Sequence, residues 1–381
     1  MKALKSKIII FGIFLISFCI FYFSGNGPTP YNYFTRLADS FLHGRYYITD
    51  NPPWLSELIL IARDKFAVVY PPAPAILLIP FLILFGSNFS QTIFANLIGA
   101  AIVCVSAILS FEITKNKLKT LYIILLTALG NILWFMSSVG SVWLLGQTVA
   151  ILFLLLAILT LEKNKNSVLV GIFLGIAFLS RVEIILAFPF FYFLLEKHKT
   201  KFLIGLFPSI SFYLFYNFLR FGNFFQTGYS LIPGVLQEPW YSNGIISPFY
   251  ILRNLKIMFT SLPSFKNTFP FIVPSWGGLS IAITSPVFIY AFLNNLKKKE
   301  IYLSIISIIA ILFLVFMHGE SGYAQFGFRF AADFYPFIFY LIIKYLQKNN
   351  LKWHHWLLLF FSILVNFWGV LLINKLGIVA P

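Results

Sequence analysis

The chain has 381 residues, of which 59% are hydrophobic and only 10% are charged, and its mean hydropathy is +0.87. Because soluble domains carry about 25% charged residues, this composition excludes an ordinary soluble protein and predicts a polytopic membrane protein. The net charge of +16 is then explained by lysine-rich cytoplasmic loops, and we expect no nucleic-acid partner.

Apolar runs long enough to cross a bilayer recur along the whole chain. Backbone groups in lipid must pair within their own segment, which favours helices, and the short alternating segments of a β-barrel are missing. We expect an all-α bundle of about 11–12 hydrophobic helices in a multi-pass protein of the cell membrane. The predicted helices cover residues 8–23, 71–86, 92–113, 120–136, 142–160, 167–180, 182–195, 202–218, 276–293, 301–317, 335–347 and 354–373.

The N-terminal sequence MKALKSK followed by a long apolar run is similar to a signal peptide. It lacks a small-residue cleavage site, so we expect an uncleaved first helix with its basic end inside. The two cysteines, Cys19 and Cys104, both lie within apolar runs. We therefore expect them to act as small hydrophobic residues and not to form a disulfide or a metal site.

The distribution of lysines predicts which segments face outward. Lysines cluster in several short loops and near the N-terminus, and if these are cytoplasmic, then segments 24–70, 219–275 and 318–334 are extracytoplasmic. Two hydrophobic segments separate the first of these outer segments from the lysine loop at 115–119, although two crossings would return the chain to its starting side. One segment therefore does not cross, and the short, proline-rich 71–86 is the candidate.

We expect residues 1–381 to form a single integral membrane domain, with a core at 1–218 and further C-terminal helices at 219–381. The first outer loop has two amphipathic pieces. In the first, apolar residues share one face at helical spacing and Arg36, Asp39 and His43 lie opposite. In the second, Pro52-Pro53 favours a helix start before Glu57. Both are predicted to be helices on the membrane surface.

The short segments 167–180 and 182–195 meet at Arg181-Val182-Glu183. This pattern fits either one long kinked helix or two crossings that meet at the membrane surface.

All arginines of the chain fall on the predicted outer side, whereas most lysines fall on the inner side. The outer residues are Arg36, Arg45, Arg63, Arg181, Arg220, Arg253 and Arg329, with the acids Asp39, Asp50, Glu57, Asp64, Glu183, Glu238, Glu320 and Asp333. Arginine is preferred where a planar fork grips phosphate or carboxylate. The set predicts an outward site for an anionic ligand, although any one arginine can instead belong to a structural ion pair.

Three stretches resemble the GT-C membrane glycosyltransferases, a superfamily that includes protein O-mannosyltransferases and lipid A aminoarabinose transferases. They are LADSFLHGRYY with VVYPPAPAILLIPFLILFG, YNFLRFGNFFQTGY at 216–229, and GYAQFGFRFAADFYPF at 322–337. The resemblance implies transfer of a sugar from a polyprenyl-phosphate donor to an acceptor at the outer membrane surface. The mannosyltransferases carry an Asp-Glu pair after the first helix, but this chain has Pro30-Tyr31-Asn32 there.

The implied reaction needs a base for the acceptor hydroxyl and positive groups for the departing phosphate. We expect Asp39 to be the base, with Glu57 and Asp64 as less favoured alternatives, and Arg329, Arg220 and Arg181 to bind phosphate. Asp333 is expected to orient Arg329 from four residues away on one helical face, with Glu183 in support. Residues expected to contact sugar are Tyr323, Gln325 and Tyr229.

No metal or other cofactor is expected, and the partners are the bilayer, the lipid-linked sugar and a glycan, protein or lipid acceptor. Alternatives are a polytopic transporter, a lipid flippase or a family member without activity. A transporter predicts internal repeats and polar groups near mid-membrane, whereas an enzyme predicts arginines and carboxylates that converge at the outer surface.

Overall fold

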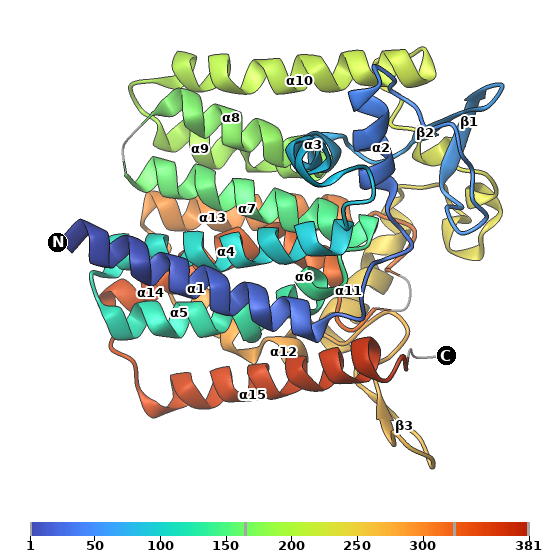
Figure 1. Ribbon diagram of the computed structural model, residues 1–381. Helices are drawn as coiled ribbons and strands as arrows, with labels where there is room; N and C mark the ends of the chain where they lie inside the picture. The colour runs from blue at the N-terminus through green and yellow to red at the C-terminus, as the bar shows by residue number, and fades with distance from the viewer. Residues whose placement is uncertain (1, 164–165, 323–324, 379–381) are drawn as a thin grey trace.

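The structure is a computed structural model that describes residues 2–163, 166–322 and 325–378, with the side chains from residue 7 onward. Long helices run side by side along one direction and form a bundle, with the N-terminus at one end and most irregular segments at the other (Figure 1). We call the latter the loop end. One large cluster of buried hydrophobic side chains joins helices from both halves of the chain.

The elements follow one another along the described chain. The helices are α1 (Lys2–Ser24), α2 (Tyr33–Leu42), α3 (Ala73–Phe85), α4 (Gln91–Thr114), α5 (Lys117–Leu129), α6 (Leu133–Val139), α7 (Val142–Glu162), α8 (Ser167–Phe178), α9 (Phe188–Leu194), α10 (Lys199–Phe221), α11 (Ile251–Thr260), α12 (Ile281–Thr284), α13 (Lys299–Phe316), α14 (Tyr335–Lys348) and α15 (Trp353–Val370). The strands are β1 (Leu58–Ala62), β2 (Lys65–Val68), β3 (Ser264–Phe265) and β4 (Ile272–Val273). The longer 3-10 helices are η1 (Val182–Ala187), η6 (Pro286–Phe292) and η7 (Arg329–Phe334).

The predicted polytopic helical fold is confirmed. In the described residues, six helices are long and apolar enough to cross a membrane, or seven if α5 and α6, bent by 52°, count as one span. Each of the twelve predicted hydrophobic segments contains helix, but several of these helices, such as α8 and α14, are shorter than a full span.

Segment 71–86 lies across the bundle. Figure 1 shows α3 nearly end-on, whereas the long helices run across the picture. The Ala73 N–H donates to the Leu179 carbonyl at 2.9 Å, and at the other end of α3 the Phe81 ring packs on Phe94 at the start of α4, with 5.2 Å between ring centroids. Both ends of α3 thus lie at the loop end, a placement that favours the prediction that segment 71–86 does not cross the membrane.

The two segments that meet at Arg181 are separate helices. α8 packs on α7 and α10, while η1 and α9 pack on α13. Close packing of α8 on α10 depends on two glycines, because a Cβ on Gly171 would meet the Phe202 carbonyl and a Cβ on Gly205 would meet the Val168 carbonyl. Small residues at helix contacts in membranes serve this close approach. The structure therefore favours two separate helices over one long kinked helix, and two full crossings stay a prediction because both helices are shorter than a span.

The first outer loop is only half as predicted. α2 forms, with Phe34, Leu37 and Ala38 buried on one face. The second predicted surface helix is wrong, because residues 58–68 form the antiparallel hairpin of β1 and β2. Two runs rich in β-branched and aromatic residues flank a polar turn in which Asp64 has φ 54°, and this pattern is typical of a hairpin. This hairpin pattern outweighs the helix-start signal of Pro52-Pro53.

Candidate active site

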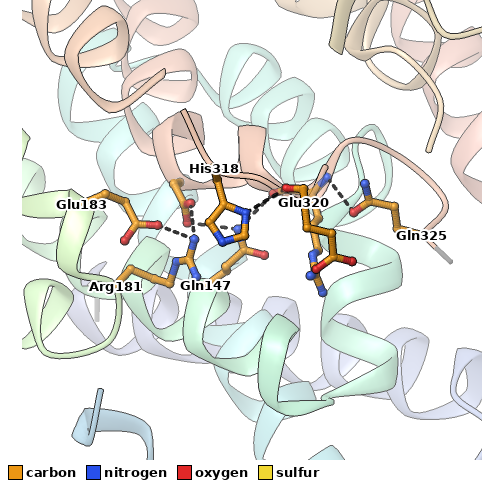
Figure 2. Close-up of polar contacts among 8 residues, drawn as sticks. Gln147, Arg181, Glu183, His318, Glu320 and Gln325 are labelled. Carbon is orange, nitrogen blue, oxygen red and sulfur yellow. Dashed lines mark hydrogen bonds and ion pairs between the residues drawn. The ribbon is translucent and has the colours of Figure 1, made fainter. Parts of the chain in front are cut away.

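Three outer segments bring polar side chains together at the loop end. They are the turn between α8 and η1, the segment from His318 to η7, and the first turns of α7. Figure 2 shows Arg181 and Glu183 on one side of His318 and Gln147, with Glu320 and Gln325 on the other. The sequence prediction that arginines and carboxylates gather at this end agrees with this arrangement.

Arg181 is held by two carboxylates. Its Nη2 pairs with Asp333 at 3.0 Å and also with Glu183. Asp333 is fully buried, and its Oδ1 accepts a hydrogen bond from the Gln147 amide at 3.1 Å. A buried charge is stable only when it is paired and hydrogen-bonded. These four side chains therefore satisfy one another in a single connected network.

Asp333 does not pair with Arg329, as was expected from their spacing of four residues. Residues 329–334 form the 3-10 helix η7, which has three residues per turn, so positions four apart do not share a face. Asp333 instead reaches Arg181, 152 residues away in sequence. The predicted Arg329–Asp333 pair is therefore wrong.

Arg329 is anchored through its backbone. Its N–H donates to the Gln325 side chain at 3.3 Å, and its carbonyl accepts from Gln147 at 3.1 Å. Its guanidinium lies over the Phe330 ring, 5.0 Å from the centroid. The Nε is buried without a hydrogen-bond partner among the described residues, although part of the side chain is accessible. Burial lowers the pKa of Arg329, and the nearby Glu320 opposes that shift.

Glu57, in the first loop, lies close enough to Arg329 for the charge of Arg329 to act on its carboxyl. Both of its carboxylate oxygens accept from the Trp143 indole N–H at 3.2 Å, and its backbone N–H donates to the Tyr33 hydroxyl at 3.2 Å. Burial raises the pKa of Glu57 to about 7, while the Trp143 hydrogen bond and the charge of Arg329 oppose the rise. A fixed carboxylate with a pKa near neutrality suits a general base.

Further polar groups surround this pair. Burial raises the pKa of Glu320 and lowers the pKa of His318, whose Nδ1 donates to the Glu320 carbonyl at 2.8 Å. Arg253 lies over the Tyr250 ring at 5.0 Å, and its Nε and Nη2 are buried without partners in the described part of the chain. Arg253 also acts on the Glu320 carboxyl, so it is a second cation for the site.

The remaining predicted sugar contacts have mixed placements. Burial raises the pKa of Tyr229, and the charges of Arg181, Glu183 and Glu57 also act on this pKa, so Tyr229 lies near these three residues. Gln325 is used internally, because its amide donates to the Gly277 and Ser321 carbonyls at 2.6 and 2.8 Å. Tyr323 lies outside the described residues.

Three other predicted site residues are not brought to this centre. Asp39 faces a separate pocket beside α2, and Asp64 is exposed at the hairpin turn, 3.7 Å from Arg63. Arg220 is buried, and its Nη2 donates to Asn217 at 2.6 Å while Nη1 donates to the carbonyls of β2 and the next residue. Both Nη groups of Arg220 thus tie α10 to the hairpin, and its Nε has no partner in the described residues.

Sequence reasoning gave little weight to Trp143, Gln147, Glu320 and Arg253. The first two sit in the first turns of an apolar helix, where nothing marks them as polar contacts. A signal for Arg253 and Glu320 existed, since both belong to the outer charged set. In the described residues, no group of three or more His, Cys, Asp or Glu side chains is arranged to hold a metal.

Known proteins resemble this chain in structure. ArnT from Cupriavidus metallidurans in the apo state matches with a TM-score of 0.52 and 13% identity, over 93% of this chain and 62% of ArnT. ArnT bound to undecaprenyl phosphate matches with a TM-score of 0.50 and 12% identity, over 92% and 61% of the two chains. The archaeal oligosaccharyltransferase AglB from Archaeoglobus fulgidus gives 0.48 and 12%, over 98% and 56%. No family model and no curated protein matches the sequence.

The likeness to ArnT confirms the fold that the sequence motifs implied: a polytopic helical GT-C-like bundle. This chain spans about three-fifths of the length of ArnT.

Proposed function

We propose that this chain is a membrane glycosyltransferase that moves a sugar from a polyprenyl-phosphate donor to an acceptor at the extracytoplasmic surface. The observation that carries the proposal is the half-buried Arg329, whose guanidinium makes no hydrogen bond in the described residues and whose charge acts on the carboxyl of Glu57. ArnT, of similar fold, is known with undecaprenyl phosphate bound. A lipid phosphate supplies the anion that such a guanidinium requires.

The reaction follows from these two groups. Glu57 takes the proton of the acceptor hydroxyl, whose oxygen attacks the anomeric carbon while the bond from that carbon to the phosphate oxygen breaks. The charge that grows on the departing phosphate is stabilised by Arg329, with Arg253 as the second cation. Arg181, already paired with Glu183 and Asp333, holds η7 in place and thereby positions Arg329. A single displacement of this kind inverts the anomeric centre.

Glu57 takes the role of base in this proposal in preference to Asp39. The reason is geometric, because Glu57 is oriented by Trp143 and acts on Arg329, whereas Asp39 lines another pocket. No metal or other cofactor enters the proposed reaction.

The alternative of a transporter or flippase receives less support. In the long helices, the described charged residues all lie near a helix end, and none marks a substrate path through the middle of the bundle.

Mass analysis of surface glycans in a deletion strain tests the proposal. Complementation with the wild-type gene is expected to restore a glycan that the deletion strain lacks, and Glu57→Gln and Arg329→Gln are expected not to. Arg63→Gln, at a side chain that is 97% exposed, is the matched control and should restore it. Full restoration by both site variants at equal protein levels would overturn the assignment, and an unchanged glycan profile in the deletion strain would overturn the function.

A further inference from the structure

A second polar pocket lies at the loop end on the outer face of α2. It has a volume of about 360 Å³ and is bounded by α2, by residues 45–50 and by the turn that joins α3 to α4. Thr35, Arg36 and Asp39 line it from successive turns of α2, so the polar face of the helix is one wall. The proposed reaction uses none of these side chains.

The lining of this pocket carries two positively and two negatively charged side chains. Arg36 pairs with Asp50, and its Nε donates to the Asn32 side chain at 2.9 Å. Arg45 and Asp39 supply the other two charges of the lining. An anion entering here would meet two carboxylates and a cation would meet two guanidinium groups, so the lining fits a neutral ligand that both donates and accepts hydrogen bonds.

Two buried polar atoms of the lining have no partner within the described residues. The Thr35 hydroxyl belongs to a side chain that is only 5% exposed, and the Nε of Arg45 is likewise buried. A buried polar atom without a hydrogen bond is unfavourable, so a ligand that satisfies it is favoured. Phe89 adds an aromatic side chain to the lining, and its ring stacks on Phe81 and Phe85 with centroids 5.2 and 5.5 Å apart.

The pocket is joined to the candidate active site through one short segment. The Gln91 side chain in its wall donates to the Tyr31 carbonyl at 3.2 Å. The Tyr31 ring packs on Trp143 with 4.8 Å between centroids, and Trp143 donates to Glu57. Three side chains in contact, Gln91, Tyr31 and Trp143, therefore connect the wall of the pocket to the proposed base.

We infer that this pocket binds a neutral saccharide. Hydroxyl groups that donate and accept suit carboxylate, guanidinium and hydroxyl partners together, and an aromatic ring suits the apolar face of a sugar. If the proposed function holds, the saccharide is a non-reacting sugar unit of the acceptor, which leaves the attacking hydroxyl near Glu57. Saccharide binding itself does not depend on transfer.

Saturation-transfer NMR on the full chain in nanodiscs tests the inference. The probes are the methyl glycosides of mannose, galactose, glucose and arabinose, and at least one is expected to bind the wild-type protein. Asp39→Asn should weaken that binding at least tenfold. Thr35→Val should do the same without loss of folding, because it removes a hydroxyl that has no partner. Arg63→Gln should bind as the wild type does.

The possible results separate the two proposals. Glu57→Gln is expected to keep glycoside binding while it loses transfer. Binding of a glycoside without any transfer activity would sink the proposed function and leave the pocket assignment standing. The pocket assignment would be overturned if no glycoside bound the wild-type protein, or if the Thr35 and Asp39 variants bound it as tightly as the wild type does. Displacement of the glycoside by inorganic phosphate would also overturn it.

Discussion

Arg220 and Arg329 are both largely withdrawn from water at the loop end, yet their surroundings differ. Arg220 gives its Nη groups to Asn217 and to two backbone carbonyls, which fixes α10 to the hairpin. Among the described residues the Nε of both arginines lacks a partner, but the hydrogen bonds of Arg329 run only through its backbone, so its Nη groups make none. An arginine whose Nη donors are used is part of the framework, whereas one whose Nη donors make no hydrogen bond in the described residues is suited to a ligand.

The largest effect is expected at the carboxylate beside Arg329. Glu57→Gln keeps the shape of the side chain but removes the base, so the transfer rate should fall by about 10²–10⁴-fold with little change in melting temperature. The measurement is the initial rate of polyprenyl-phosphate release from the donor that the glycan analysis identifies. Asp39→Asn is the comparison, and a larger loss there than at Glu57 would return the role of base to Asp39.

The framework arginine should respond in the opposite way. Arg220→Met leaves the carbonyls of Val68 and Val69 without their donor, and we expect a loss of about 2–4 kcal/mol in stability. Thermal unfolding in detergent measures this as a lower melting temperature. Protein that remains folded should bind undecaprenyl phosphate normally, and a selective loss of lipid binding at unchanged stability would assign Arg220 to the site after all.

The pH dependence of transfer should report the raised pKa of Glu57. The base must be ionised, and because burial raises its pKa to about 7, the rate should be constant above that pH and fall tenfold per unit below it. The pH profile of the initial rate at saturating donor checks this. A flat profile between pH 5 and 8 would exclude Glu57 as the base.

The smallest effect is expected at Trp143. Trp143→Phe removes the hydrogen bond that holds down the pKa of Glu57, so the midpoint of the pH profile should move upward and the rate at pH 7 should fall several-fold. Trp240→Phe is a control at a tryptophan whose indole donates to Glu238. An unchanged midpoint in the Trp143 variant would separate Trp143 from the site.

The sequence sufficed for the helical segments, the polar face of α2 and the gathering of charges at one end, because hydrophobic length and charge bias are local signals. It did not reveal the hairpin of β1 and β2, where a proline signal competed with β-branched runs. The partner of Asp333 was also missed, since the choice depends on η7 being a 3-10 helix. The Glu57–Trp143 contact joins residues 86 apart in sequence, and no local pattern marks it.

The most direct measurement of the central claim is the affinity of the purified chain for undecaprenyl phosphate by native mass spectrometry. The wild-type protein and Arg63→Gln should bind it equally, and Arg329→Gln should bind it at least tenfold more weakly while melting at the same temperature. Equal affinity of the wild type and the Arg329 variant would contradict the claim that this guanidinium holds the lipid phosphate.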